Sequence, residues 1–218
     1  MFEGIKRFFR DRKLRKFASD VPTGFLPMEK IRTVNVVIDV EEPGFDLLRE
    51  DILSWGRTTG LKVNIYFFDF RKVGKDELLL TTIDKTLLRS GLDWLGTPNV
   101  MKLTSLLEEK SDLLISMIDN GEFPIEFLSK CTKASFKVGR HAFKGHAYDL
   151  VVSGAANEDL RSDSRRIFQE ITEFLLKIKY YEKIEGLPAH QCKGCLYGCC
   201  RCDSWCIRRY NCLYHGHI

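Results

Sequence analysis

The apolar and polar positions are easiest to interpret over residues 111–140, SDLLISMIDNGEFPIEFLSKCTKASFKVGR, where a strand, a helix and a second strand follow one another. Residues 113–118 form a nearly unbroken apolar run, which is typical of a strand covered on both faces. Residues 119–121 interrupt this run, and Pro124 suits the first turn of a helix because its missing N–H would have no partner there. With a further strand at residues 134–138, the segment predicts a βαβ unit.

The same order of elements occurs upstream. A strand is expected over residues 32–40, RTVNVVIDV, because Val and Ile favour β structure. Residues 45–55 place apolar side chains at helical spacing, and residues 62–70, KVNIYFFDF, form the next expected strand. A strand, a helix and a strand in such a short stretch imply a parallel pair joined by a crossover helix.

The remaining segments are less regular. Residues 72–100 show no clear period, residues 101–110 predict a helix, and residues 148–153 predict a strand whose orientation stays open. A long final helix is expected over residues 157–183. The whole pattern predicts one α/β domain over residues 28–185, with a Rossmann-like three-layer fold, a mostly parallel sheet of about five strands and helices on both faces.

Residues 1–20 precede this domain and predict a basic amphipathic helix, because apolar residues and Lys or Arg alternate at helical spacing. The apolar positions of this helix are Phe2, Ile5, Phe9 and Phe17. They could pack on the domain and leave the charges solvated. Alternatively, residues 1–18 could lie on an anionic membrane surface, and nucleic-acid binding is the least favoured alternative.

Charge is unevenly distributed along the 218 residues, whose net charge is +4. Residues 1–20 carry +4 and residues 187–218 carry +3, so the body between them is mildly acidic. No run of eighteen apolar residues predicts a transmembrane helix, and no apolar stretch follows the basic N-terminus as a secretory signal would require. We therefore expect a cytoplasmic protein, which its N-terminal helix could hold peripherally at the inner membrane.

Three expected strands end in an aspartate: Asp39, Asp69 and Asp119. The carboxyl ends of parallel strands meet at one edge of the sheet, which is where ligands of open α/β folds bind. Clustered carboxylates there could bind Mg²⁺ or act as acid and base. The alternative is that each one only forms a turn or caps the next helix.

A small basic group, Lys137, Arg140 and Lys144, follows the strand at residues 134–138 and could receive an anion. No phosphate-binding glycine motif follows the first strand, because VEEPGF has one Gly and two acidic residues there. A standard dinucleotide or nucleoside triphosphate site is therefore not expected. Cys131 falls on the apolar side of an expected helix and is interpreted as a packing residue.

Residues 186–218 contain seven of the eight cysteines and lack apolar periodicity. Their spacing is that of a zinc site, whose candidate ligands are Cys192, Cys195, Cys199, Cys202, Cys212 and His215. Bound zinc would fold such a tail by itself. The abrupt change of composition favours another interpretation, a disordered or non-native tail. Disulfides are the third alternative, which the cytosolic character of the body disfavours.

The segments LDWLGTPNV, SDLLISMID and SKCTKASFKVGRHAFKGHAYDLVV resemble an uncharacterised family of short Bacteroidota proteins, a domain of unknown function. The resemblance covers roughly residues 1–183 and ends where the cysteine-rich tail begins. It implies an α/β fold with a basic N-terminal helix, and it implies no catalytic residues. SDLLISMID and ASFKVGR also resemble the N-terminal half of heptosyltransferase-type glycosyltransferases, whose second, nucleotide-sugar-binding domain has no counterpart here.

The sequence thus favours a non-enzymatic domain that binds a ligand or partner, without naming either. Two alternatives stay open. One is a glycosyltransferase-like or other transferase that uses the carboxylates at the strand ends, and the other is a zinc-binding protein that acts through its tail.

Overall fold

The computed structural model describes residues 2–71, 81–82, 85–152 and 164–182. Within these residues the helices are α1 (Phe2–Phe17), α2 (Phe45–Thr59), α3 (Thr104–Leu107), α4 (Phe123–Cys131) and α6 (Ser164–Glu182). The strands are β1 (Thr33–Asp39), β2 (Lys62–Asp69), β3 (Thr86–Leu88), β4 (Ser111–Ser116), β5 (Ala134–Gly139) and β6 (Leu150–Val151). Short 3₁₀ turns lie at Met28–Lys30, Arg89–Gly91 and Val100–Leu103.

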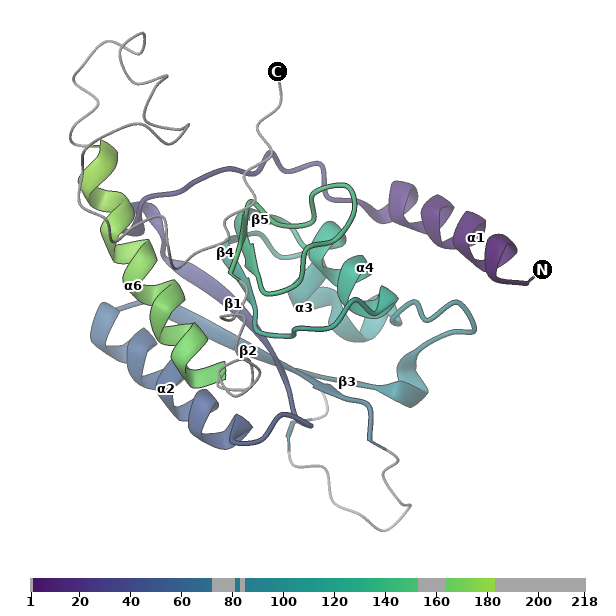
Figure 1. The fold of residues 1–218 in the computed structure, drawn as a ribbon, viewed down its shortest axis with the longest axis horizontal. Coiled ribbons are helices and arrows are strands. Elements are labelled where there is room, and N and C mark those ends of the chain that lie inside the picture. The colour runs from purple at the N-terminus through teal and green to yellow at the C-terminus, as the bar shows by residue number, and fades with distance from the viewer. Residues whose placement is uncertain (1, 72–80, 83–84, 153–163, 183–218) are drawn as a thin grey trace, which may run out of the picture.

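The six strands form one sheet in the order β3-β2-β1-β4-β5-β6, and every neighbouring pair is parallel (Figure 1). This is the strand order of a doubly wound Rossmann sheet. At its centre Val36 of β1 lies between Ile65 of β2 and Ile115 of β4, so β-branched side chains fill the middle of the sheet. The α/β prediction is confirmed.

The sheet has one strand more than the predicted number of about five. The additional strand is β3, whose three residues lie in the segment without clear periodicity and are too few to show an alternation. β6 pairs in parallel with β5, which answers the question left open for residues 148–153. The residues of the tail and part of the segment 72–100 lie outside the described residues.

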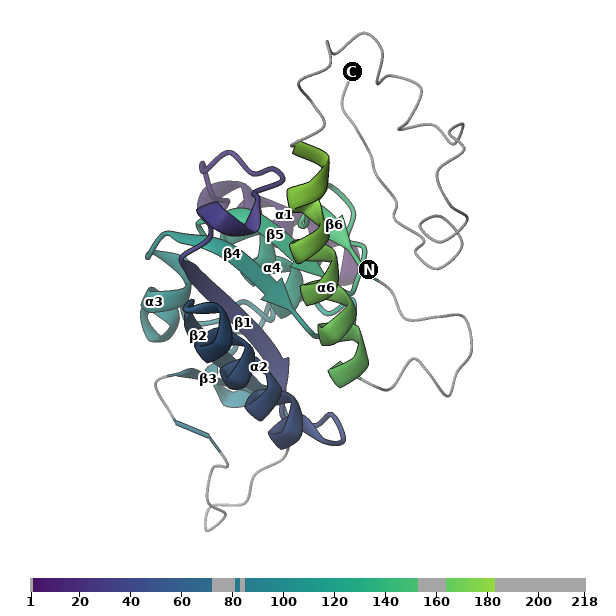
Figure 2. The ribbon, with the colours of Figure 1, turned by 90° about the vertical axis from the view of Figure 1, so that its left-hand side faces the viewer.

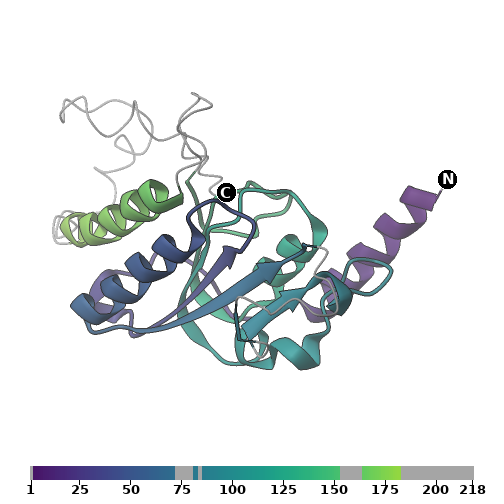
Figure 3. The ribbon, with the colours of Figure 1, turned by 90° about the horizontal axis from the view of Figure 1, so that it is seen from below.

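Helices cover both faces of the sheet, as predicted (Figures 2 and 3). Alternate side chains of each central strand point to opposite faces, so that Val36 and Ile38 pack toward α2 and α6 while Val37 packs toward α3 and α4. The result is two apolar cores, one on each face. This explains why the central strands read as continuous apolar runs instead of alternating ones.

One expected helix differs from the structure, and another is described only in part. The helix expected over residues 101–110 is a 3₁₀ turn, Val100–Leu103, followed by the single turn of α3, and β4 begins at Ser111. The helix expected over residues 157–183 is observed as α6, Ser164–Glu182, and the residues before Ser164 lie outside the described part of the chain.

The N-terminal helix is attached to the domain by its second half. Leu14 is buried in the core that α4 covers, and the ring of Phe17 lies edge-on to that of Phe127, with 6.0 Å between the ring centroids. Lys13 forms an ion pair with Asp93. The first half of α1 projects beyond the rest of the molecule (Figures 1 and 3). None of the helices within the described residues is long and apolar enough to cross a membrane.

Candidate functional site

The carboxyl edge of the sheet brings the three predicted aspartates to neighbouring strands. Asp39 is the last residue of β1, Asp69 is the last residue of β2, and Asp119 follows β4. Because β2, β1 and β4 are adjacent, these residues share one edge, as the sequence predicts. Their environments differ, however, and so does what each carboxylate can do.

Asp69 is occupied by a neighbouring arginine. Its side chain is completely buried, and Arg71 donates Nε to Oδ1 at 2.8 Å and a terminal nitrogen to Oδ2 at 2.7 Å. These hydrogen bonds, more than the positive charge itself, hold the pKa of Asp69 below its ordinary value despite burial. Asp69 therefore serves to hold Arg71, two residues further along the chain.

Asp39 is half-buried beside other acidic residues. Burial raises its pKa above the ordinary value, and the nearby charges of Glu41, Glu42 and Asp69 act in the same direction. The hydrogen bond from the backbone N–H of Glu41 to Oδ1, at 2.8 Å, opposes this shift. This environment therefore favours the protonated form of Asp39 more than water does.

Asp119 belongs to a hub built on Arg140, which follows β5. The Arg140 side chain is 1% exposed, and its guanidinium lies 2.8 Å from Oε1 of Glu42 and 3.5 Å from Oδ2 of Asp119. The same guanidinium donates to the carbonyl of Met117 at 2.9 Å and to Oγ of Ser164 at 2.7 Å. Ser164 in turn donates to Glu42.

This hub lies where the order of the strands reverses. The chain leaves β1 toward β2 on one side and leaves β4 toward β5 on the other, so the crevice between β1 and β4 is the usual ligand position of such a sheet. Here Arg140 ties together Glu42 after β1, Asp119 after β4 and Ser164 of α6. The residue predicted to receive an external anion is thus compensated by internal carboxylates.

Glu42 and Ser164 are members of this hub that the sequence analysis missed. In the sequence, Glu42 is one of the two acidic residues of VEEPGF, a segment that lacks a phosphate-binding glycine motif. One signal could have identified it: Glu42 follows one parallel strand and Arg140 follows another, so both lie at the same edge of the sheet, where their opposite charges can pair. Because Glu42 and Arg140 lie 98 residues apart, no local pattern joins them.

Lys137 is not part of the edge cluster. Its side chain is buried against α4, where Nζ donates to the carbonyl of Ser129 at 2.8 Å. Burial lowers its pKa to about 8, and Asp149 opposes that shift. Lys137 therefore satisfies a carbonyl in the last turn of α4, where a cation also opposes the helix dipole. Cys131 is buried nearby, as predicted, and burial raises the pKa of its thiol to about 12.

The predicted zinc ligands, Cys192, Cys195, Cys199, Cys202, Cys212 and His215, lie outside the described residues. Within the described residues, no group of three or more His, Cys, Asp or Glu side chains is arranged to hold a metal ion. Zinc binding by the tail stays a prediction.

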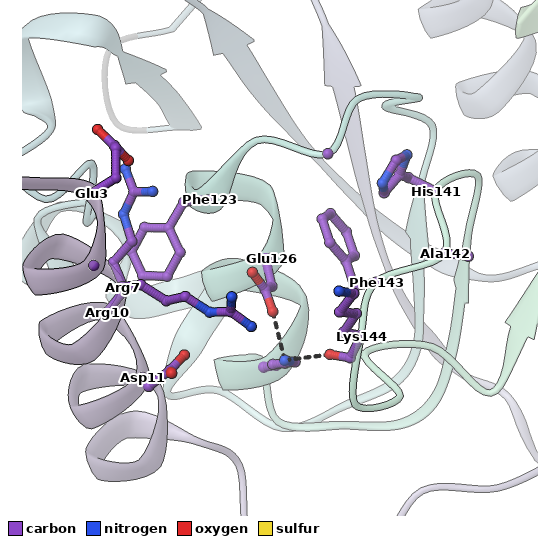
Figure 4. Close-up of a pocket in the computed structure, with 13 residues that line it drawn as sticks. Glu3, Arg7, Arg10, Asp11, Phe123, Glu126, His141, Ala142, Phe143 and Lys144 are labelled. Atoms are coloured by element: carbon purple, nitrogen blue, oxygen red, sulfur yellow. Dashed lines mark hydrogen bonds and ion pairs between the residues drawn. The ribbon is translucent and has the colours of Figure 1, made fainter. Parts of the chain in front are cut away.

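A second candidate region lies away from the sheet edge. A groove of about 700 Å³ runs between α1, the start of α4 and the loop at residues 141–144. Arg7, Arg10 and Asp11 line one side, while Phe143 and Lys144 line the other (Figure 4). Phe123 and Glu126 of α4 lie between the two sides (Figure 4). Three distant segments of the chain form this groove, which is why the sequence analysis missed it.

The α4 side of the groove and the loop are fixed to each other. Lys130 donates Nζ to Oε1 of Glu126 at 2.6 Å and to the carbonyl of Lys144 at 2.9 Å. A Cβ atom at Gly121 would lie 2.7 Å from Nε2 of His141, so the two segments approach this closely because residue 121 has no side chain.

The α1 side is fixed by Arg10. Its Nε donates to the carbonyl of Leu95 at 2.7 Å, and its guanidinium lies 4.6 Å from the centre of the Phe123 ring. The cation–π contact and the hydrogen bond orient Arg10 without neutralising its charge. The groove is therefore preorganised from both sides.

The opposite face of α1 is exposed. Ile5, Phe8, Phe9, Arg12 and Lys16 recur at the spacing of one helical stripe, and all five are exposed. We call these five residues the outer stripe. Phe8 is 61% exposed, and Trp94, 66% exposed, lies edge-on to Phe9 with 6.1 Å between the ring centroids. Of the apolar positions predicted for this helix, Phe17 packs on the domain and Ile5, which is 50% exposed, does not.

Comparison with known proteins gives a family and no activity. Residues 6–174 match a family of unknown function, DUF6913, over more than half of the chain. No curated protein matches the sequence, and no solved structure matches it either. The expected resemblance to an uncharacterised family is confirmed, whereas the comparisons show neither its expected taxon nor a likeness to glycosyltransferases. The chain belongs to DUF6913.

Proposed function

We propose that this protein is a non-enzymatic binding domain that attaches peripherally to an anionic membrane surface through the outer stripe of α1 and Trp94. The observation that carries the proposal is the exposed side of α1, where the aromatic side chains of the projecting first half are followed on the same stripe by Arg12 and Lys16.

Charge supports an anionic surface as the partner. The two acidic residues of α1, Glu3 and Asp11, line the groove instead of the outer stripe, which carries Arg12 and Lys16 and no carboxylate. Each Lys or Arg close to an anionic bilayer contributes about 1 kcal/mol of binding free energy. The stripe can therefore approach phospholipid headgroups without like-charge repulsion from its own residues.

The aromatic side chains support a bilayer instead of a purely ionic partner. Tryptophan is enriched at the interface between water and lipid, and phenylalanine gains free energy when it enters the acyl boundary. The centroid of the Phe9 ring lies 5.7 Å from that of Phe8 and 6.1 Å from that of Trp94, so the three rings form one continuous patch. Other exposed apolar residues, such as Leu47 on α2, are isolated from this patch, as is usual on protein surfaces.

The carboxyl edge gives less support to the alternative transferase function. Arg71 engages Asp69 and Arg140 engages Asp119, so two of the three edge carboxylates are held by internal arginines. A peripheral location at the inner membrane is part of our proposal, and an enzymatic role for Asp39 is not.

Co-sedimentation with vesicles tests the proposal. Because Leu14 is buried, deleting α1 would disturb the core, so charge reversal on the surface is the better perturbation. Arg12→Glu combined with Lys16→Glu should weaken binding to phosphatidylglycerol vesicles by at least about 2 kcal/mol, or at least about thirtyfold, because two favourable charges are lost and two repulsive ones are added. Substitution of Trp94 and Phe8 by Ser should weaken it further through loss of apolar burial.

The matched control reverses two exposed cations on the other side of the molecule, Arg57 of α2 and Lys62 of β2. It should bind vesicles like the unmodified protein, and neutral phosphatidylcholine vesicles should bind none of these proteins. If the control and the stripe variant lose vesicle binding equally, net charge alone attracts the protein to the vesicles and the proposal is wrong. Binding to RNA with vesicle binding absent would replace the membrane by a nucleic acid as the partner.

A further inference from the structure

We propose that the groove between α1, the start of α4 and the loop at residues 141–144 binds a phosphate monoester, either a free organic phosphate or a phospholipid headgroup. This inference goes beyond membrane attachment. It rests on the other side of α1 and stands if the outer stripe proves not to bind membranes.

The first support is the balance of charges inside the groove. Glu126 is compensated by Lys130, with 2.6 Å between Oε1 and Nζ, and Glu3 lies 3.8 Å from Nζ of Lys6. Within the described residues, the side chains of Arg7 and Lys144 have neither an ion-pair partner nor a hydrogen-bond partner. The charge of Arg10 is also uncompensated, because its hydrogen bond goes to a backbone carbonyl.

The remaining charges therefore favour an anion with more than one negative charge. Asp11 is the one groove carboxylate without a cationic partner among the described residues, and Arg7, Arg10 and Lys144 outweigh it. Cations on both sides of a cavity attract an anion into the space between them. Phosphate monoesters carry close to two charges at neutral pH and offer three acceptor oxygens.

The second support is the kind of donor that the groove presents. An arginine guanidinium gives two parallel N–H donors, which match the spacing of phosphate oxygens, and a lysine adds a mobile point charge. Arg7 supplies the guanidinium from α1, and Lys144 supplies the lysine from the loop (Figure 4). The rings of Phe123 and Phe143 line the space between them and suit the carbon part of an ester.

The third support is that the two sides of α1 are chemically distinct. Glu3, Arg7 and Asp11 are four residues apart and share one side of the helix, whereas the outer stripe follows residues 5, 8, 12 and 16 on the other. Substitutions can therefore change the groove without changing the stripe, and the reverse also holds. The two proposals can be tested separately on one protein.

Isothermal titration of the full chain with glycerol 3-phosphate tests the groove directly. We expect saturable binding at one site, which Arg7→Glu and Lys144→Glu should each weaken by at least about tenfold, because each removes a charge-assisted contact. The matched control, Arg12→Glu, reverses a cation of the same helix on its other side and should change the affinity less than about twofold.

A second variant tests the shape of the groove without altering charge. Gly121→Ala places a methyl group where Nε2 of His141 lies 2.7 Å away, so the His141 ring, which lines the groove, must shift. We expect weaker binding of glycerol 3-phosphate with an unchanged thermal midpoint. Amide chemical shifts of residues 121–130 and 141–144 should move on titration of the unmodified protein.

Vesicles identify the source of the phosphate. If Arg7→Glu weakens binding to phosphatidic acid vesicles more than to phosphatidylglycerol vesicles, the ligand is a lipid headgroup. If it weakens glycerol 3-phosphate binding but affects both vesicles equally, the ligand is a free phosphate ester. The inference is overturned if glycerol 3-phosphate and inorganic phosphate show no saturable binding up to about 10 mM. Equal loss of binding in Arg7→Glu and Arg12→Glu also overturns it.

Discussion

Replacing Arg140 by Met should destabilise the domain, because the hub at the carboxyl edge depends on one guanidinium. The substitution keeps an unbranched side chain that can fill the buried space, and it removes the positive charge and the donors. It leaves the carbonyl of Met117 and the hydroxyl of Ser164 in a buried region without the guanidinium. Glu42 and Asp119 then both lose the guanidinium that they contact.

The expected cost follows from the exposure of these partners. Removing one member of a buried ion pair typically costs about 3–5 kcal/mol. The side chains of Glu42 and Asp119 are 22% and 38% exposed, so water can solvate both after the substitution. The cost should therefore fall near the lower limit, about 3 kcal/mol. A domain of ordinary stability, about 5–15 kcal/mol, would remain folded.

Urea unfolding gives the measurement, provided that the dependence of the free energy on urea is unchanged by the substitutions. Glu42→Gln and the double variant complete a double-mutant cycle, in which we expect a coupling energy above about 1 kcal/mol. A cost below about 1 kcal/mol for Arg140→Met would refute the account of the hub. Additive effects in the cycle would refute the link between Arg140 and Glu42.

Three further predictions concern pH. Burial and neighbouring acids raise the pKa of Asp39, so its protonated form stabilises the fold below pH 3.8 and this contribution is lost as pH rises. Asp39→Asn should therefore be more stable than the unmodified protein at pH 7, with the gap closing below pH 3.8 in urea unfolding. In contrast, burial alone would raise the pKa of Asp112, but the backbone N–H of Thr33 and other donors lower it. Asp112→Ala should thus cost about 1–3 kcal/mol at pH 7 and less as pH falls below 3.8, and a pH-independent cost would contradict this. Burial lowers the pKa of Lys137 from 10.5 to about 8. As pH rises from 8 to 10.5, the free energy of unfolding of the unmodified protein should therefore increase by up to about 3 kcal/mol relative to that of Lys137→Met. Parallel stability curves for the two proteins would contradict this burial effect.

The sheet could be predicted because its strands carry their own signal. Residues such as Val36 and Ile115 lie in apolar runs that only a doubly covered strand explains, and the turn residues between them separate strand from helix. The position of Asp39, Asp69 and Asp119 at one edge followed from parallel pairing alone. These inferences need only local sequence and one topological rule.

The roles of the site residues could not be predicted in the same way. Arg140 and Lys137 are three residues apart and looked like one basic group, but they point to opposite faces of the sheet. Arg140 contacts Glu42, and Lys137 contacts Ser129 under α4. Such partners come from elsewhere in the chain and depend on side-chain direction. The groove was missed for the same reason, since α1 meets α4 only after folding.

Fluorescence of Trp94 tests the central claim, that the protein binds through the exposed side of α1. The sequence contains three tryptophans, so Trp55→Phe with Trp205→Phe leaves Trp94 alone, and Trp94→Phe with Trp205→Phe leaves Trp55 alone. Trp55 lies on α2 and packs against Phe168, on the other face of the sheet. With phosphatidylglycerol vesicles that contain brominated lipid, we predict a blue shift and quenching of Trp94 and no change for Trp55. Vesicle binding with Trp94 unquenched would contradict the account, because another surface would then hold the protein on the membrane.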